Sequence, residues 1–173
     1  SPNRWHFYYS TDGVNGAGSV YWDYTFSTST WYHVAIVRDG DYMTMYVNGT
    51  LVGTNAFTAN IADVNFNLQI GGYISTLDDY YLDGYMDEIR ISNTARYNGN
   101  FTAPTAAYTA DANTSLLLHC DGSNGGTSFT DSSWTGIGGK GHTITAVGDV
   151  TNTRAQSKVG DSSIKFDGTG DSL

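Results

Sequence analysis

The chain has 173 residues and a formal net charge of −9, with 17 acidic side chains against eight Lys and Arg. Nucleic-acid binding needs clustered cations that displace phosphate counterions, so the charge excludes nucleic acid as an expected partner. The chain has no continuous apolar run of 18 residues, which excludes membrane insertion by a helix. Cys120 is the only cysteine, so no disulfide can form within the chain.

The first 30 residues contain two short aromatic-rich segments, 5–9 (WHFYY) and 19–26 (SVYWDYTF). Aromatic residues favour strands, and the intervening Asp and Gly residues favour turns. This pattern predicts a β-hairpin.

A second group of strands is predicted within residues 31–54. The apolar runs 34–37 and 43–47 are separated by Asp39-Gly40, and Asn48-Gly49 follows the second run. Both dipeptides favour the positive φ angles of tight hairpin turns. We expect a three-stranded antiparallel meander.

The rest of the chain alternates strand patterns with loops. Phe66, Leu68 and Ile70 alternate with polar residues, which predicts a half-buried strand over 66–72. We expect a loop over 73–83 and further strands over 84–92, 116–120, 142–147 and 163–166. No segment sustains a period of 3.6 residues, so the fold class is all-β, an antiparallel sandwich.

Several motifs resemble one family. Residues 31–35 (WYHVA), 38–40 (RDG) and 46–49 (YVNG) resemble the laminin-G-like branch of the concanavalin A-like jelly rolls. Residues 70–72 (IGG), 84–92 (GYMDEIRIS) and 95–104 (ARYNGNFTAP) resemble its closing strand and tail. The resemblance implies a concanavalin A-like jelly-roll β-sandwich.

The order of the motifs is reversed relative to the family. Residues 114–122 (TSLLLHCDG) and 164–173 (IKFDGTGDSL) resemble the opening of a module, yet they follow the closing segment. We therefore expect residues 1–105 to be the C-terminal portion of one module, 106–114 a linker, and 115–173 the N-terminal portion of the next. A permuted, shortened single module is the alternative.

Catalysis is not expected. Related jelly-roll glucanases alternate acidic residues along one strand, whereas Glu88 is the only glutamate and adjoins Asp87. His33 and His119 fall within predicted strands and have structural roles in the family motif. We expect a protein that is not an enzyme.

Carboxylates and aromatic rings suggest binding sites instead. We expect Ca²⁺ at Asp78, Asp79 and Asp83, with Asp12 contributing, because calcium prefers several oxygen ligands. The tyrosines Tyr73, Tyr80 and Tyr81 of the same loop, with Trp5 and Tyr8 of the aromatic hairpin, offer flat faces for sugar rings.

These features and the resemblance lead to one functional hypothesis. We expect a non-catalytic recognition module that binds carbohydrate or a cell-surface glycan, within a longer repetitive protein that is extracellular, on a cell surface or on a virion, such as a tail fibre. Neighbouring copies of the module are expected partners. The alternatives are a structural spacer or self-assembling fibre module, and a binding appendage of a larger secreted hydrolase.

Overall fold

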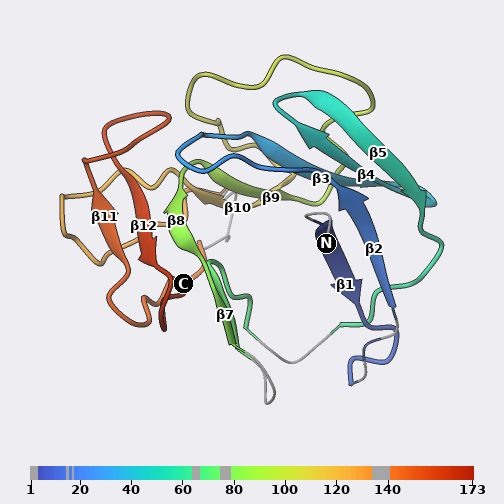
Figure 1. The fold of residues 1–173 in the computed structure, drawn as a ribbon, viewed down its shortest axis with the longest axis horizontal. Coiled ribbons are helices and arrows are strands. Elements are labelled where there is room, and N and C mark those ends of the chain that lie inside the picture. Colours follow the sequence, from blue (N-terminus) through green and yellow to red (C-terminus); the bar gives the residue numbers. More distant parts are fainter. Residues whose placement is uncertain (1–3, 15, 17, 64–66, 75–78, 134–140) are drawn as a thin grey trace. The chain divides into compact units, whose positions relative to one another are not determined.

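The computed structural model describes residues 4–14, 16, 18–63, 67–74, 79–133 and 141–173. It divides the chain into two compact units. Unit 1 comprises residues 1–67 and 95–103, and unit 2 comprises residues 68–94 and 104–173. All the regular structure in the described ranges is β-strand, and every strand pair is antiparallel, so the predicted all-β class is confirmed (Figure 1).

The described residues of unit 1 form five strands in two sheets. A hairpin forms one sheet and a meander of order β3-β4-β5 forms the other. The strands are β1 (Arg4–Tyr9), β2 (Gly18–Asp23), β3 (Val34–Asp39), β4 (Tyr42–Val47) and β5 (Thr50–Ala56). The predicted hairpin and meander are therefore both present.

Alternate residues of the hairpin and meander build the core of unit 1. Trp22 and Phe57 pack with Met43, Met45 and Val47 in one buried cluster. The indole N–H of Trp22 donates to the carbonyl of Gly53 at 2.9 Å, which satisfies the only polar atom that the Trp side chain brings into this core.

The turn between β4 and β5 depends on its two predicted residues. Asn48 and Gly49 have φ of 51° and 78°, the left-handed pair that suits the twist of a hairpin. Gly49 is buried and exchanges a backbone bond with Phe101, whose N–H donates to the Gly49 carbonyl at 2.9 Å. The close approach of residue 101 therefore needs a glycine at 49.

In the described part of unit 2, seven strands form three small sheets. They are β6 (Gly72–Ile74), β7 (Asp79–Tyr81), β8 (Asp83–Met86), β9 (Ile89–Ser92), β10 (Thr114–Leu118), β11 (Thr151–Thr153) and β12 (Ser163–Asp167). β6 pairs with β7, β10 pairs with β9, and the third sheet has the order β11-β12-β8. Strands far apart in the sequence thus pair within this unit.

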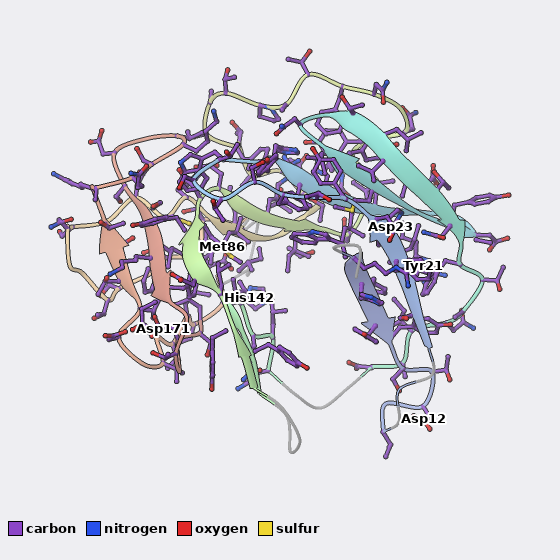
Figure 2. All side chains as sticks on the ribbon, in the orientation of Figure 1. Asp12, Tyr21, Asp23, Met86, His142 and Asp171 are labelled. Atoms are coloured by element: carbon purple, nitrogen blue, oxygen red, sulfur yellow. The ribbon has the colours of Figure 1, made fainter. Side chains whose placement is uncertain are left out.

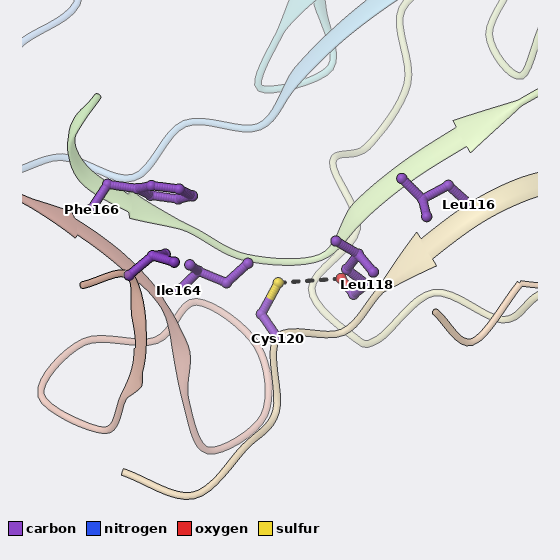
Figure 3. Packing of buried hydrophobic residues seen from close by; sticks show 6 residues of the cluster. Leu116, Leu118, Cys120, Ile164 and Phe166 are labelled. Atoms are coloured by element: carbon purple, nitrogen blue, oxygen red, sulfur yellow. Dashed lines mark hydrogen bonds between the residues drawn. The ribbon is translucent and has the colours of Figure 1, made fainter. Parts of the chain in front are cut away.

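The core of unit 2 draws on both of its chain segments. Leu116, Leu118 and Cys120 pack with Ile164 and Phe166 (Figure 3). Ile70, Leu82, Met86 and Ile89 of the earlier segment pack against this cluster. Neither segment builds the core alone, so residues 68–94 depend on residues 114–167 for burial of their apolar side chains.

Three predictions for unit 2 were wrong in detail. The described part of 66–72 forms no strand before Gly72, although Ile70 exchanges two backbone hydrogen bonds with Leu173, both 2.9 Å. The predicted loop 73–83 contains the β6–β7 hairpin. The predicted single strand 84–92 is broken between β8 and β9, where Glu88 has a φ of 51°.

Two further expectations also need correction. The segment 142–147 forms no strand, and only Val147 makes an isolated bridge, to Ser172. His33 and His119 lie just outside strands, because β3 begins at Val34 and β10 ends at Leu118.

Replacing Gly49 by alanine should destabilise unit 1 far more than replacing Gly40. Gly40 also has a positive φ, 56°, but its added Cβ would meet no atom within 4 Å, whereas a Cβ at Gly49 would collide with the Phe101 carbonyl. We expect G40A to cost about 1 kcal/mol and G49A at least about 2 kcal/mol more. Urea denaturation followed by circular dichroism measures both, and equal costs would contradict the contact with Phe101.

Candidate functional site

The outward face of the β1–β2 hairpin carries a group of exposed aromatic and charged side chains, which we call the aromatic patch. Because side chains alternate along a strand, residues of even number on β1 and odd number on β2 point away from the core. The register pairs Arg4 with Asp23 and His6 with Tyr21. The patch consists of Arg4, His6, Tyr8, Tyr21 and Asp23 (Tyr21 and Asp23 labelled in Figure 2).

The side chains of the aromatic patch contact one another. The His6 ring lies 5.2 Å from the Tyr8 ring, with 10° between their planes, and 5.7 Å from the Tyr21 ring. The Arg4 guanidinium lies 4.3 Å from the Tyr21 ring centroid, and its Nε donates to Asp23 Oδ1 at 2.9 Å. These contacts hold the rings in place while Tyr8 remains 74% exposed.

Trp5 lies on the other face of the same hairpin. It is separated from Tyr8 by three positions, an odd number, so the two side chains alternate to opposite sides of the strand. Trp5 pairs across the hairpin with the buried Trp22, and its ring lies 4.9 Å from Phe26. The structure therefore brings Tyr8 together with His6 and Tyr21, and not with Trp5.

The tyrosines predicted from residues 73–83 belong to the β6–β7 hairpin of unit 2. The backbone of Tyr73 pairs with Tyr80, and that of Tyr81 pairs with Gly72. Tyr80 is 64% exposed and Tyr81 is half-buried. The side chain of Tyr73 lies outside the described part of the chain.

The predicted calcium ligands are described only in part. Asp78 and the side chain of Asp79 lie outside the described residues. Asp12 is exposed in the β1–β2 connection, where its carboxylate accepts from the Ser10 hydroxyl and the Val14 N–H (Figure 2). Asp83 is exposed at the start of β8, directly across from Asp167 of β12.

A cluster of three carboxylates next to Asp83 was not predicted. Ligand atoms of Asp149, Asp167 and Asp171 lie within 4.8 Å of one another. Asp171 is 1% exposed and accepts the backbone N–H groups of Asp149 and Asp167, at 2.8 and 3.0 Å. The negative charge of Asp167, and to a smaller extent that of Asp171, raises the pKa of Asp149. A cation beside the three carboxylates would therefore be stabilised.

One sequence signal could have identified part of this cluster. Residues 167–171 read DGTGD, and Gly168 and Gly170 have φ of 88° and 73°. The two left-handed residues reverse the chain so that Asp171 returns to the backbone of Asp167. Asp149 has no such local signal, because only the tertiary structure brings it to the pair.

The acidic residues between β8 and β9 are engaged in structural contacts. The side chain of Glu88 is 8% exposed, its Oε1 lies 2.8 Å from His119 Nδ1, and its Oε2 accepts the Tyr108 N–H at 2.8 Å. Asp87 Oδ2 accepts the N–H groups of Lys158 and Val159. Both carboxylates therefore anchor neighbouring segments.

Among the described carboxylates of unit 2, that of Asp131 accepts the most hydrogen bonds. Its side chain is fully buried and accepts from the backbone of Leu117, Ser133 and His142, from the Ser133 hydroxyl and from His142 Nδ1. Burial by itself raises the pKa of this carboxyl, but the hydrogen bonds outweigh it and lower the pKa to about 2. Asp131 is therefore a structural carboxylate that joins β10 to the 131–142 segment.

The described residues form an all-β protein with an exposed aromatic patch and several carboxylates that accept backbone N–H groups. Residues 1–99 match a laminin-G family model described as the concanavalin A-like lectin/glucanases superfamily, and the chain belongs to this family. The predicted family is therefore confirmed. No curated protein and no solved structure matched the chain.

Membership of this family indicates a lectin-like or binding module. Laminin-G-like modules are generally non-catalytic binding domains and are commonly extracellular. Within the described residues, no helix has the length and apolar character needed to cross a bilayer.

Replacing Asp131 by asparagine should reduce the stability of unit 2 and flatten its dependence on pH. A carboxylate whose pKa is lowered from 3.8 to about 2 stabilises the fold above pH 4, and this contribution is lost as the pH falls from about 4 to 2. We expect D131N to lower the free energy of unfolding by about 2 kcal/mol at pH 7. Urea denaturation at pH 7, 4 and 2.5 measures the difference.

The exposed Asp39 provides the control for this prediction. D39N should leave the stability within about 0.5 kcal/mol of the parent at every pH. If D131N and the parent chain lost the same stability between pH 4 and 2.5, the assignment of the acid-sensitive contribution to Asp131 would be wrong.

Proposed function

We propose that the chain is a non-catalytic recognition module that binds carbohydrate, such as a cell-surface glycan, through the aromatic patch. The supporting observation is the exposure of Tyr8 and Tyr21 at 74% and 46%, beside His6 on the same face. Aromatic faces contact the apolar C–H faces of sugar rings, and Arg4 and Asp23 supply hydrogen-bonding groups at the edge. Family membership supports the same function.

The setting of this function is also part of the proposal. We propose that the module acts outside the cell, on a cell surface or on a virion, as one part of a longer repetitive protein. Tyr80 and Tyr81 of the β6–β7 hairpin, together with Tyr73, remain candidates for a separate glycan contact in unit 2. Trp5 remains a candidate on the other face of the β1–β2 hairpin, with 39% of its surface exposed.

We propose in addition that the module binds Ca²⁺ through carboxylates of unit 2. Calcium requires six to eight oxygen ligands, and Asp149 and Asp167 are exposed beside the buried Asp171. Both oxygens of Asp171 already accept N–H groups, so the two exposed carboxylates would contribute most. Among the ligands predicted from the sequence, Asp83 lies across from Asp167 and fits this location. Asp78 and Asp79 are the other predicted ligands of the same segment, and Asp12 belongs to unit 1 and is a separate candidate.

A self-assembling structural module is the second candidate function. The supporting observation is that β8 pairs with β12 and β9 pairs with β10. β8 and β9 lie in the segment that resembles a module's closing strand, whereas β10 and β12 lie in the segments that resemble a module's opening. Identical pairing between neighbouring copies would link them by strand exchange. The same pairing within one chain would give a permuted single module.

Removing aromatic rings from the patch should weaken glycan binding. We expect Y8A and Y21A each to lower the affinity for a glycan selected on an array at least about tenfold, because each removes a ring face. Y42A is the matched control, since Tyr42 is 56% exposed on β4 and lies outside the patch. Unchanged binding by both Y8A and Y21A would eliminate the patch as the glycan site.

Calcium should bind with a measurable heat and raise the melting temperature. We expect D149N to weaken calcium binding at least about tenfold, because it removes one carboxylate from the cluster, whereas the exposed D39N should not. Calorimetry and thermal melts with and without chelator measure both effects. If D83N or D12N weakened calcium binding and D149N did not, the calcium site would lie at the carboxylates predicted from the sequence. If calcium produced neither a binding heat nor a change in melting temperature, calcium binding would be refuted.

Cysteines placed across β8 and β12 should distinguish closure within a chain from exchange between chains. Tyr85 and Lys165 are paired in register, with Cα atoms at the spacing that a disulfide spans. Under the recognition-module proposal, the oxidised Y85C/K165C variant should be a covalent monomer on a non-reducing gel. Covalent dimers that exceed those of Y85C alone would instead support strand exchange as the assembly mechanism.

A further inference from the structure

A cavity of about 170 Å³ lies beside the end of β10 in unit 2. Its lining includes a histidine, a carboxylate, three hydroxyl groups and one aromatic ring: His119, Asp121, Ser128, Thr130, Ser132 and Phe129. In another protein a cavity of about 150 Å³ accommodates one benzene molecule. The cavity therefore has room for a single six-membered ring, and it is smaller than the usual sites for larger ligands.

The imidazole of His119 is held in one orientation by Glu88. Glu88 has a left-handed backbone, and its carboxylate bonds to His119 Nδ1 at 2.8 Å while also accepting the Tyr108 N–H. An ionised carboxylate can only accept hydrogen bonds, so the proton of this contact lies on His119 Nδ1. In the neutral ring Nε2 is then an acceptor, and no other described residue bonds to this ring.

The thiol of Cys120, which also lines the cavity, is not activated as a nucleophile. Burial raises the pKa of the Cys120 thiol to about 12, so the thiol stays protonated at neutral pH and donates to the Leu118 carbonyl at 3.3 Å (Figure 3). The remaining lining residues offer hydrogen-bonding groups and the apolar side chains of Leu118 and Phe129.

The charge of the lining selects against anions. Asp121 is exposed and lines the cavity, and Glu88 lies directly behind His119. The hydroxyls of Ser128, Thr130 and Ser132 both donate and accept hydrogen bonds, as the hydroxyls of a sugar do. Phe129, which is half-buried, offers an apolar surface beside them.

We propose that this cavity is a separate subsite for one neutral pyranose ring, with His119 Nε2 accepting a ring hydroxyl and Phe129 contacting the ring's apolar face. Glu88 acts as a positioning residue, because it orients the imidazole and does not line the cavity. The choice of a sugar rests on the proposed carbohydrate function, whereas the location and polarity of the subsite rest on unit 2 alone.

Titration of the ¹⁵N-labelled full chain with methyl pyranosides, namely those of glucose, galactose, mannose and N-acetylglucosamine, tests the subsite. At least one should shift the amide resonances of His119, Asp121 and Phe129 with a dissociation constant in the millimolar range. H119Q should weaken this binding about tenfold, because it removes the oriented acceptor. T130W should abolish it by filling the cavity.

Thr127 provides the matched control, since it is exposed on the same segment and does not line the cavity. T127W should bind as the parent chain does, and an equal loss in T127W and T130W would overturn the proposal. Shifts confined to residues 4–23 would overturn the subsite and leave the aromatic patch intact. Shifts confined to residues 118–132 would support the subsite even if the patch failed, and the absence of shifts in both regions would overturn both.

Discussion

The break between β8 and β9 at Asp87 and Glu88 is the constraint on which unit 2 depends. The left-handed backbone at Glu88 ends one strand and begins another, so β8 pairs with β12 while β9 pairs with β10. The two side chains then join the surrounding segments: Asp87 accepts two N–H groups of the 158–159 loop, and Glu88 bonds to His119 and to the backbone of Tyr108. A continuous strand would provide neither set of contacts.

Carboxylates that accept backbone N–H groups recur in the described part of unit 2. Asp87, Glu88, Asp131 and Asp171 each accept a backbone N–H group from a residue outside the strands. A protein with short strands and long connections leaves many such donors without partners, and burial makes an unsatisfied donor costly. Aspartate is short enough to reach them, which accounts for part of its abundance here.

The alternation of strand side chains leaves aromatic rings of the β1–β2 hairpin outside the core. The hairpin of unit 1 buries Trp22 on one face and presents Tyr8 and Tyr21 on the other. The aromatic sequence predicted this hairpin. However, the two residues of the hairpin that the sequence analysis selected for sugar binding, Trp5 and Tyr8, are an odd number of positions apart and lie on opposite faces. The alternation of side chains along both strands places His6 and Tyr21 on the same face as Tyr8, so this pattern could have identified them in place of Trp5.

Local patterns in the sequence determined the all-β class, the β1–β2 hairpin, the β3–β5 meander with its Asn48-Gly49 turn, and the strands β10 and β12. These depend on alternation and turn residues within a few positions, which a single sequence records directly. Only the tertiary structure decided the pairing of β8 and β9 with strands near residues 116 and 165, the meeting of Asp149 with Asp167 and Asp171, and the Glu88–His119 contact. Each joins residues more than 15 positions apart, and such contacts depend on which complementary surfaces meet when the chain folds, a choice that no local periodicity encodes.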